Sequence, residues 1–311
     1  MINTKKEIME TLSMVISEVG YTPKAVVNET LNISYDGLTY VPETSETPSD
    51  GWCAPVFNLD FLAKELENGD MTMGDIVAYS INIMKQDTTS IYDRFKNNYD
   101  WETAKHNLRI VICSADVNKD LLEHCIFKQV EDLAIVPLLK IDIEEETDEE
   151  AEGYCSVPKT MRHLWNVTEE EVIDTALSCS VDNEEPCFVN IFDPGFLFEA
   201  IKGIKPILTP EFKENFQNAH LVCLTNKNGN YGAAVIFYPG LLKKVYEYLG
   251  EPFYILPSSV HEVMICSMVR EERSVEELKE MVVSVNTIAV SESEKLADSV
   301  YCYDGTFKKL L

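Results

Sequence analysis

The chain has 311 residues, of which 26 are basic and 53 acidic, giving a net charge of −27 at pH 7. This excess of carboxylates disfavours direct binding to nucleic acid or to an anionic membrane. No apolar run reaches the roughly 18 residues of a transmembrane helix, so we expect no membrane span.

The N-terminus and the cysteines predict a cytoplasmic protein. The first residues continue into an amphipathic segment with Glu7, Glu10 and Glu18, unlike the apolar core of a signal peptide. The nine cysteines are odd in number, and several lie inside apolar runs, which favours reduced thiols over a disulfide framework.

The first part of the chain mixes helical and extended patterns. Apolar residues at three- and four-residue spacing predict a helix over residues 5–18, ended by Gly20. Asp36-Gly37 predicts the turn of a hairpin or meander over residues 26–40. The following patterns predict an exposed loop over 42–51, a strand over 54–59, a helix ending near 69 and another over 73–86.

The middle of the chain carries two apolar strands and a capped helix. Thr168-Glu-Glu-Glu171 is a capping box that begins a helix running to about residue 179. The other elements predicted here are strands over 108–113, 131–143 and 153–158 and a short helix over 116–125.

An acidic segment lies between two of these strands. Residues 141–152 contain eight carboxylates and no cation, which predicts a solvated hairpin loop. The segment lacks the spacing of a calcium loop. If the protein docks on a basic partner, the candidate interaction residues are Glu144, Glu145, Glu146, Asp148, Glu149 and Glu150.

The C-terminal part is rich in short strands. The predicted strands are 220–225, 232–238, 253–256, 263–267 and 299–303, and the predicted helices are 195–201, one from 209, 239–249, 274–285 and one capped at 291–294. Residues 226–230 contain Asn-Gly and predict a hairpin turn. The Gly229-x-x-Gly232 spacing also fits a phosphate loop, but these glycines lead into a predicted strand and not into a helix.

The element order predicts an α+β fold with mixed, largely antiparallel sheets and flanking helices. We expect residues 222–224, 235–237 and 253–255 to share one sheet. The polar residues 180–186 suggest two α+β lobes, over residues 1–180 and 181–311.

Pro257-Ser-Ser-Val-His-Glu262 concentrates polar chemistry between apolar runs. Ser259 and His261 are the candidate nucleophile and base of a hydrolase. In an extended segment, however, Glu262 points away from His261 and cannot orient it. The alternative is a structural turn in which His261 hydrogen-bonds the backbone. The pairs His220/Cys223 and His261/Cys266 lie in predicted strand regions, so we expect no metal site and no cofactor.

Several stretches resemble a family of uncharacterised proteins common in anaerobic gut bacteria and their mobile elements. They are Leu-Thr-Asn-Lys-Asn-Gly-Asn-Tyr-Gly-Ala-Ala over 224–234, Ile-Leu-Pro-Ser-Ser-Val-His-Glu over 255–262, and residues 280–283, 285–286 and 298–303. Residues 54–59 and 131–136 fit more loosely. The resemblance covers nearly the whole chain and implies no particular chemistry.

Three functional hypotheses follow. The first is a non-catalytic, acidic, cytoplasmic interaction protein, an accessory factor or inhibitor of a mobile element, that engages a basic, nucleic-acid-handling protein. The second is a Ser/His hydrolase centred on residues 258–262. The third is a small-ligand binder with its pocket near the 257–262 turn. The sequence indicates neither the substrate nor the oligomeric state.

Overall fold

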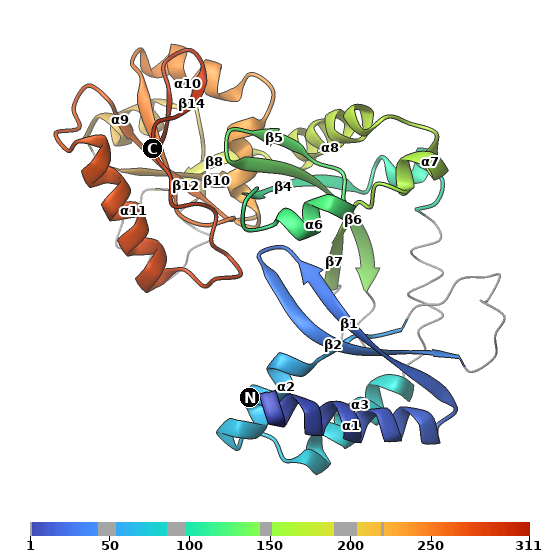
Figure 1. Ribbon diagram of the computed structural model, residues 1–311. Helices are drawn as coiled ribbons and strands as arrows, with labels where there is room; N and C mark the ends of the chain where they lie inside the picture. The colour runs from blue at the N-terminus through green and yellow to red at the C-terminus, as the bar shows by residue number, and fades with distance from the viewer. Residues whose placement is uncertain (1, 43–53, 86–97, 144–150, 190–203, 219–220) are drawn as a thin grey trace. The chain divides into compact units, whose positions relative to one another are not determined.

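The computed structural model describes residues 2–42, 54–85, 98–143, 151–189, 204–218 and 221–311 (Figure 1). Helices and largely antiparallel sheets alternate irregularly, which confirms the α+β class. Contacts divide the chain into two compact units. The N-terminal unit comprises residues 1–97 with 142–150, and the C-terminal unit comprises 98–141 with 151–311.

This division differs from the expected boundary between residues 180 and 181. Residue 180 lies inside helix α8 (Glu169–Asn183), and strand β8 (Pro186–Val189) follows after two residues. The polar stretch 180–186 resembled a linker, but its Ser180 and Glu184 are both buried. The polar composition of this stretch therefore does not mark an exposed linker throughout.

In its described residues, the N-terminal unit packs three helices on a three-stranded sheet. Its elements are α1 (Ile2–Glu18), β1 (Tyr21–Thr30), β2 (Ile33–Pro42), β3 (Phe57–Asn58), α2 (Leu59–Asn68) and α3 (Met73–Lys85). Ile8, Leu12 and Ile16 recur every fourth residue on α1 and are fully buried. They share a core with Leu38, Tyr40, Phe57 and Leu62. Asn58 caps α2, and Gly69 ends it in the left-handed conformation.

The hairpin of this unit is present, but its turn is not at Asp36-Gly37. Strands β1 and β2 pair from Tyr21↔Pro42 to Thr30↔Ile33, so the chain turns at residues 31–32. Asn32 adopts φ 62°, a left-handed conformation that asparagine tolerates. Gly37 lies inside β2, where an added Cβ would collide with the Val56 side chain. The Asp-Gly pair therefore reflects close packing and not a turn.

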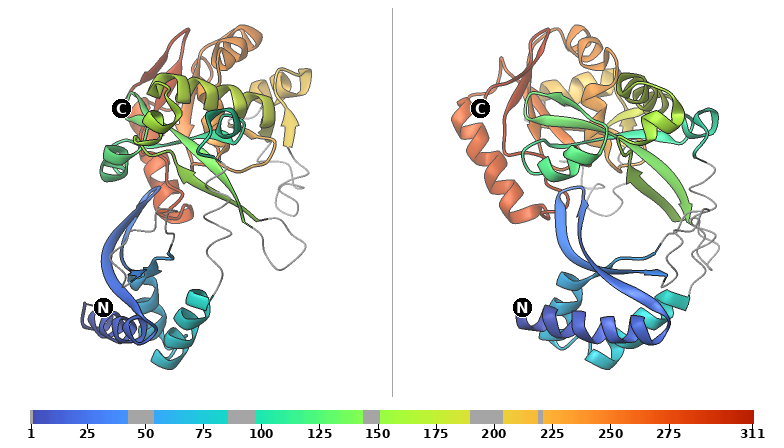
Figure 2. Two further views of the ribbon diagram at one scale, coloured as in Figure 1. Left: turned by 90° about the vertical axis from the view of Figure 1, so that its right-hand side faces the viewer. Right: turned by 45° about the vertical axis from the view of Figure 1, so that its right-hand side comes forward.

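The described residues of the C-terminal unit form a four-stranded and a seven-stranded sheet. Figures 1 and 2 show both sheets. The smaller sheet has the order β4-β6-β5, and β7 also pairs with β6. Its strands are β4 (Leu108–Ser114), β5 (Lys128–Val130), β6 (Leu133–Ile143) and β7 (Ala151–Ser156). The accompanying helices are α5 (Trp101–Ala104), α6 (Lys119–His124), α7 (Met161–Trp165) and α8. Thr168 caps α8 by accepting the Glu171 N–H, as predicted.

The larger sheet is antiparallel and has the order β14-β13-β11-β12-β10-β8-β9. Its other strands are β9 (Ile204–Pro206), β10 (Val222–Asn226), β11 (Phe253–Pro257), β12 (Val263–Ser267), β13 (Tyr301–Tyr303) and β14 (Phe307–Lys309). The accompanying helices are α9 (Pro210–Asn218), α10 (Leu241–Leu249) and α11 (Val275–Ala289), which begins with a complete capping box at Ser274 and Glu277.

Among the described residues of the C-terminal unit, two predicted elements adopt a different structure. Residues 232–237 form a 3₁₀ helix, η1 (Gly232–Phe237), so they do not join the sheet that contains 222–224 and 253–255. Gly232 to Ile236 are all buried, and a uniformly apolar run does not distinguish a strand from a short helix. Residues 291–294 form a turn in which Ser291 Oγ donates to Glu294, and no helix follows.

Asp132 links the two sheets of the C-terminal unit. It precedes β6, and its carboxylate accepts hydrogen bonds from Ser299 Oγ at 2.7 Å, Tyr301 Oη at 2.6 Å and Lys309 Nζ at 2.7 Å. All three donors lie on or beside β13 and β14. One carboxylate therefore attaches the turn before β6 to the edge of the larger sheet.

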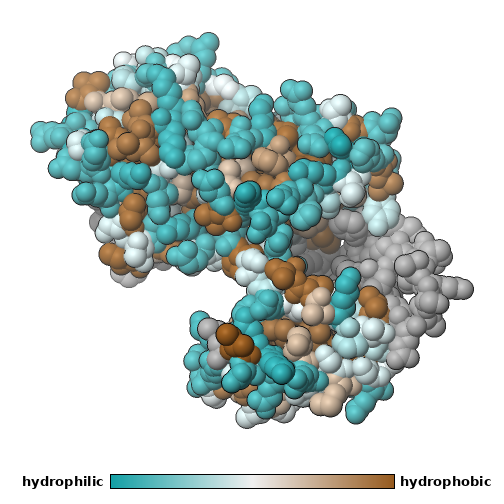
Figure 3. All heavy atoms as spheres, in the orientation of Figure 1, coloured by the Kyte–Doolittle hydropathy of each residue, from teal (hydrophilic) through white to brown (hydrophobic). Residues whose placement is uncertain are grey.

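Hydrophilic side chains cover much of the face in Figure 3, and hydrophobic residues form small separate patches. In the described part of the chain, no helix is long and apolar enough to cross a membrane. The eight cysteines described there carry free thiols. Burial raises the pKa of Cys113 to about 12 and that of Cys155 to about 11, which suppresses the reactive thiolate.

Candidate functional site

Residues 258–262 follow Pro257, the last residue of β11, and form the connection to β12. The Ser259 N–H donates to the Glu262 carbonyl oxygen at 3.2 Å and closes the turn. The Val260 N–H donates to the Glu294 carbonyl oxygen at 2.8 Å. The connection is therefore closed on itself and attached to the segment after α11.

Both serine hydroxyls contact their own turn. Ser258 Oγ donates to Glu262 Oε1 at 3.3 Å. Ser259 is buried, and its Oγ accepts the backbone N–H of His261 at 3.1 Å. The structure thus brings Ser259 and His261 together through the histidine backbone and not through the imidazole.

The imidazole of His261 faces other partners. Its Nδ1 accepts the Tyr231 backbone N–H at 3.1 Å, and its Nε2 lies 3.6 Å from Glu294 Oε1. The ring also stacks on Tyr231, with 5.6 Å between centroids. A hydrolytic pair needs a ring nitrogen facing the hydroxyl, whereas this geometry matches the structural turn with a backbone hydrogen bond.

Residues 226–232 form a second loop that contacts the first. Thr225 Oγ1 donates to the His261 carbonyl oxygen at 2.8 Å. At Gly232, an added Cβ would collide with Thr225 Oγ1 and lie 2.7 Å from the His261 carbonyl oxygen. Only glycine leaves room for this approach. Residues 229–232, which have the phosphate-loop spacing, therefore pack closely against the first loop and lead into η1.

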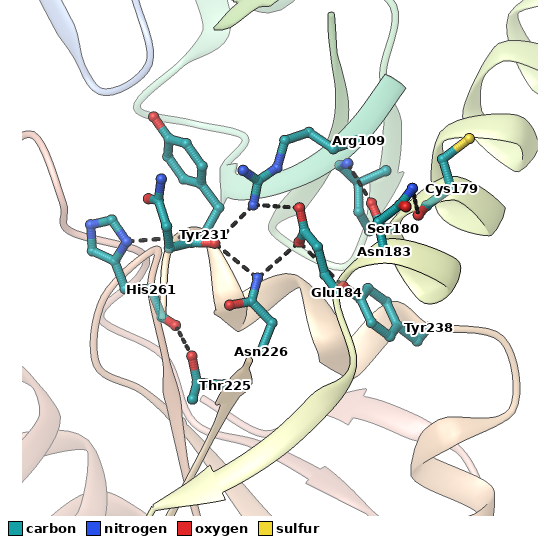
Figure 4. Close-up of polar contacts among 12 residues, drawn as sticks. Arg109, Cys179, Ser180, Asn183, Glu184, Thr225, Asn226, Tyr231, Tyr238 and His261 are labelled. Carbon is teal, nitrogen blue, oxygen red and sulfur yellow. Dashed lines mark hydrogen bonds and ion pairs between the residues drawn. The ribbon is translucent and has the colours of Figure 1, made fainter. Parts of the chain in front are cut away.

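A buried ion pair lies beside the contact between the two loops (Figure 4). Arg109 Nη2 on β4 is 2.8 Å from Glu184 Oε1 at the end of α8, and the two side chains are only 7% and 8% exposed. Burying two charges is costly unless they pair and form further hydrogen bonds. The neighbouring groups supply such bonds.

The two loops and the ion pair form one hydrogen-bonded cluster. The Asn230 carbonyl oxygen accepts Arg109 Nη2 at 2.8 Å and Asn226 Nδ2 at 2.9 Å. Asn226 Nδ2 also donates to Glu184 Oε2 at 2.8 Å, and Tyr238 Oη donates to the same oxygen at 3.5 Å. Arg109 Nε and Asn226 Oδ1 have no partner among the described protein atoms, which adds to the cost of burial.

Aromatic rings extend the cluster to a further strand. The Arg109 guanidinium lies 4.8 Å from the ring centroid of Tyr154 on β7 and 5.2 Å from that of Tyr231. Cation–π contacts of this kind are strengthened by removal from water. Arg109 consequently connects β4, β7, the end of α8 and the loop after β10.

Burial dominates the titration of this cluster. It raises the pKa of Glu184, although the nearby Arg109 and the hydrogen bonds from Asn226 and Tyr238 act in the opposite direction. The pKa of the Tyr238 hydroxyl is also raised, first by burial and then by the charge of Glu184. Burial therefore disfavours the charged carboxylate, and Arg109 and the hydrogen-bond donors offset only part of this cost.

Sequence reasoning missed the ion pair, although one signal was present. Arg109 is the single charged residue in the apolar run Leu-Arg-Ile-Val-Ile-Cys over 108–113, and a charge on a buried strand requires a partner. Nothing local marks Glu184, because it lies among other acidic residues, Asp182 and Glu185, at the end of the helix.

The predicted interaction residues Glu144, Glu145, Glu146, Asp148, Glu149 and Glu150 lie outside the described residues. The flanking strands β6 and β7 do pair with each other. In the described part, no group of three or more His, Cys, Asp or Glu side chains has the arrangement of a metal site.

A separate acidic groove runs along the exposed face of α8. It is shallow and open to solvent, with a volume of about 620 Å³. Its lining includes the exposed carboxylates Glu170, Glu171, Asp174 and Asp182, together with Lys105 and His106. Lys105 already pairs with Glu102 at 2.5 Å. The spacing of Glu170, Asp174 and Asp182, by four and then eight residues, was visible in the sequence, but the groove beside them was not.

The chain is a member of the family of unknown function DUF5688, whose model matches residues 4–305. Comparisons with curated proteins and with solved structures gave no match.

Proposed function

We propose that the protein is a non-catalytic, acidic binding protein that docks on a basic partner protein. The observation that carries this proposal is the groove along α8, in which four exposed carboxylates line a hollow of about 620 Å³. Lysine or arginine side chains of an extended segment fit such a surface by charge and by length. The net charge of −27 increases the rate of encounter with a cationic surface.

The arrangement of the Ser/His segment agrees with this proposal. Its hydroxyls and imidazole engage the turn, the Tyr231 amide and Glu294, and thereby fix the loop next to the buried ion pair. These contacts give the segment a structural role that leaves recognition to the charged surface.

In its fuller form, the proposal makes the chain a cytoplasmic accessory factor or inhibitor of a mobile element that engages a basic, nucleic-acid-handling protein. The segment 144–150 then adds a second acidic contact. This form is motivated by the charge balance and by the family resemblance, and nucleic acid itself is not the expected ligand.

A decalysine peptide tests the groove. We expect the variant E170Q/E171Q/D174N/D182N to lose roughly tenfold or more in affinity, because each exposed charge contact contributes up to about 1 kcal/mol. The control E272Q/E276Q/E280Q/E292Q removes the same number of exposed carboxylates elsewhere and should lose only about twofold. Titration calorimetry from about 50 to 500 mM salt should show affinity falling as salt rises. Equal losses in both variants, or binding indifferent to salt, would reject the groove.

The acidic segment is tested in the same way. Neutralising Glu144, Glu145, Glu146, Asp148, Glu149 and Glu150 should weaken decalysine binding further if the segment contributes. Unchanged affinity would restrict the docking surface to α8. For the fuller proposal, proteins retained from native lysate by the wild type, but not by the groove variant, should be basic nucleic-acid binders. Acidic partners would contradict it.

A further inference from the structure

The hydrogen bond between His261 and Tyr231 depends on protonation. The Tyr231 N–H donates to His261 Nδ1 at 3.1 Å, so Nδ1 must carry a lone pair and no proton. A doubly protonated imidazole has a proton on each nitrogen and cannot accept at either. Protonation would therefore set two N–H groups facing each other.

The second ring nitrogen has an anionic neighbour. Glu294 Oε1 lies 3.6 Å from Nε2, and its side chain is half exposed. A carboxylate at this distance stabilises the charged imidazolium. Among the charged groups nearby, the Glu262 carboxylate interacts with Ser258, and the Arg109 guanidinium lies against the Tyr231 ring. The protonated ring is thus attracted by Glu294 and opposed by the Tyr231 amide.

The hydrogen bond to His261 holds the backbone of Tyr231 in an uncommon conformation. Tyr231 has φ 53°, in the left-handed region that non-glycine residues seldom adopt. Its neighbour Asn230 supplies the carbonyl oxygen that accepts Arg109 Nη2. Loss of the hydrogen bond to His261 would therefore free the loop at Tyr231. This residue is next to Asn230, whose carbonyl oxygen contacts the buried ion pair.

We propose that His261 is a pH-sensitive latch that holds the 226–232 loop closed when neutral and releases it when protonated. The direction of the pH effect follows from the role of His261 Nδ1 as a hydrogen-bond acceptor. The closed loop excludes the second proton, so it is favoured while the imidazole is neutral and loses stability when a fall in pH protonates the ring. The inference is independent of the proposed docking function.

Amide hydrogen exchange of Tyr231 measures the latch. In protein labelled with ¹⁵N-tyrosine, the Tyr231 signal is assigned by its absence in Y231F. Its protection factor, corrected for intrinsic exchange, should fall by up to tenfold per pH unit below the midpoint, because one proton is coupled to opening. The Ile110 amide, which donates to Ser180 Oγ, reports on global unfolding in separately labelled protein and should show no such fall.

Two variants separate the latch from general acid destabilisation. H261N places an amide oxygen, which does not titrate, near the position of Nδ1, so protection of Tyr231 should become independent of pH. E294Q removes the attraction for the imidazolium and should shift the midpoint to lower pH. The matched control H163N removes an exposed histidine on α7 and should behave as wild type. Constant Tyr231 protection from pH 8 to 5 in the wild type would overturn the proposal. A pH dependence of Tyr231 protection that is unchanged in H261N would also overturn it. If H261N does not fold, E294Q decides the question, and an unshifted midpoint in that variant would overturn the proposal.

Discussion

Glu184 and Asp132 are two carboxylates of one unit, and both accept several hydrogen bonds, yet their environments move their pKa values in opposite directions. Glu184 is 8% exposed, and burial raises its pKa. Asp132 is 20% exposed. Burial acts to raise its pKa as well, but the hydrogen bonds from Lys309, Tyr301 and Ser299 outweigh this effect and lower it. The comparison shows that the number of donors does not decide the outcome, because residual contact with water changes the cost of the charge.

Removing the cation from each cluster should give the largest contrast. Arg109→Met leaves Glu184 buried without its counter-ion, and we expect a loss of about 3–5 kcal/mol in the free energy of unfolding. Lys309→Met removes a partner that is 35% exposed, and water can replace it. Its expected loss is below about 1 kcal/mol. Urea denaturation of both variants measures the difference, and equal losses would break the comparison.

Removing a hydroxyl should produce a smaller effect. Tyr301→Phe deletes the hydrogen bond to Asp132 Oδ1 and should cost about 1 kcal/mol, since the remaining donors still hold the carboxylate. Tyr238→Phe deletes a longer bond of 3.5 Å to Glu184 and should cost less. Thermal denaturation of the two matched variants checks this order, and a larger loss in Tyr238→Phe would show that the Glu184 cluster depends on every donor.

The smallest effect is the pH dependence, in which the two carboxylates should act with opposite sign. The lowered pKa of Asp132 means that its contribution is complete above pH 3.8 and is lost as the pH falls further. The raised pKa of Glu184 means that the folded state takes up a proton above pH 4.5, so stability increases as the pH falls toward that value. Urea unfolding of the wild type, Asp132→Asn and Glu184→Gln between pH 3 and 6 should give difference curves of opposite slope. Parallel curves would contradict the assignment.

Local signals in the sequence predicted much of the fold. The cap at Thr168 and the end of a helix near Gly69 are encoded within a few residues, and the structure confirms them. Apolar runs likewise predicted β10, β11 and β12.

Features that depend on distant residues could not be predicted in this way. The turn of the first hairpin was misplaced because Gly37 serves close packing against Val56, which no neighbouring residue reveals. Residues 232–237 were expected as a strand, because burial on all sides removes the periodicity that distinguishes the two structures. In the candidate site, the motif 257–262 drew notice by its composition, and its backbone-bonded His261 was predicted. Its contacts to Tyr231 and Glu294 required the fold.

The spacing of the Arg109 cluster along the chain has a kinetic consequence. Arg109 and Asn230 are 121 positions apart, and Glu184 and Asn226 are 42 apart. Large loops must close before these groups meet, so we expect the cluster to form after the rate-limiting step of folding. Arg109→Met should then raise the unfolding rate and leave the folding rate nearly unchanged. The slopes of both arms of the chevron plot should stay the same. The cluster would thus act mainly on the lifetime of the folded protein and little on how quickly that state is reached.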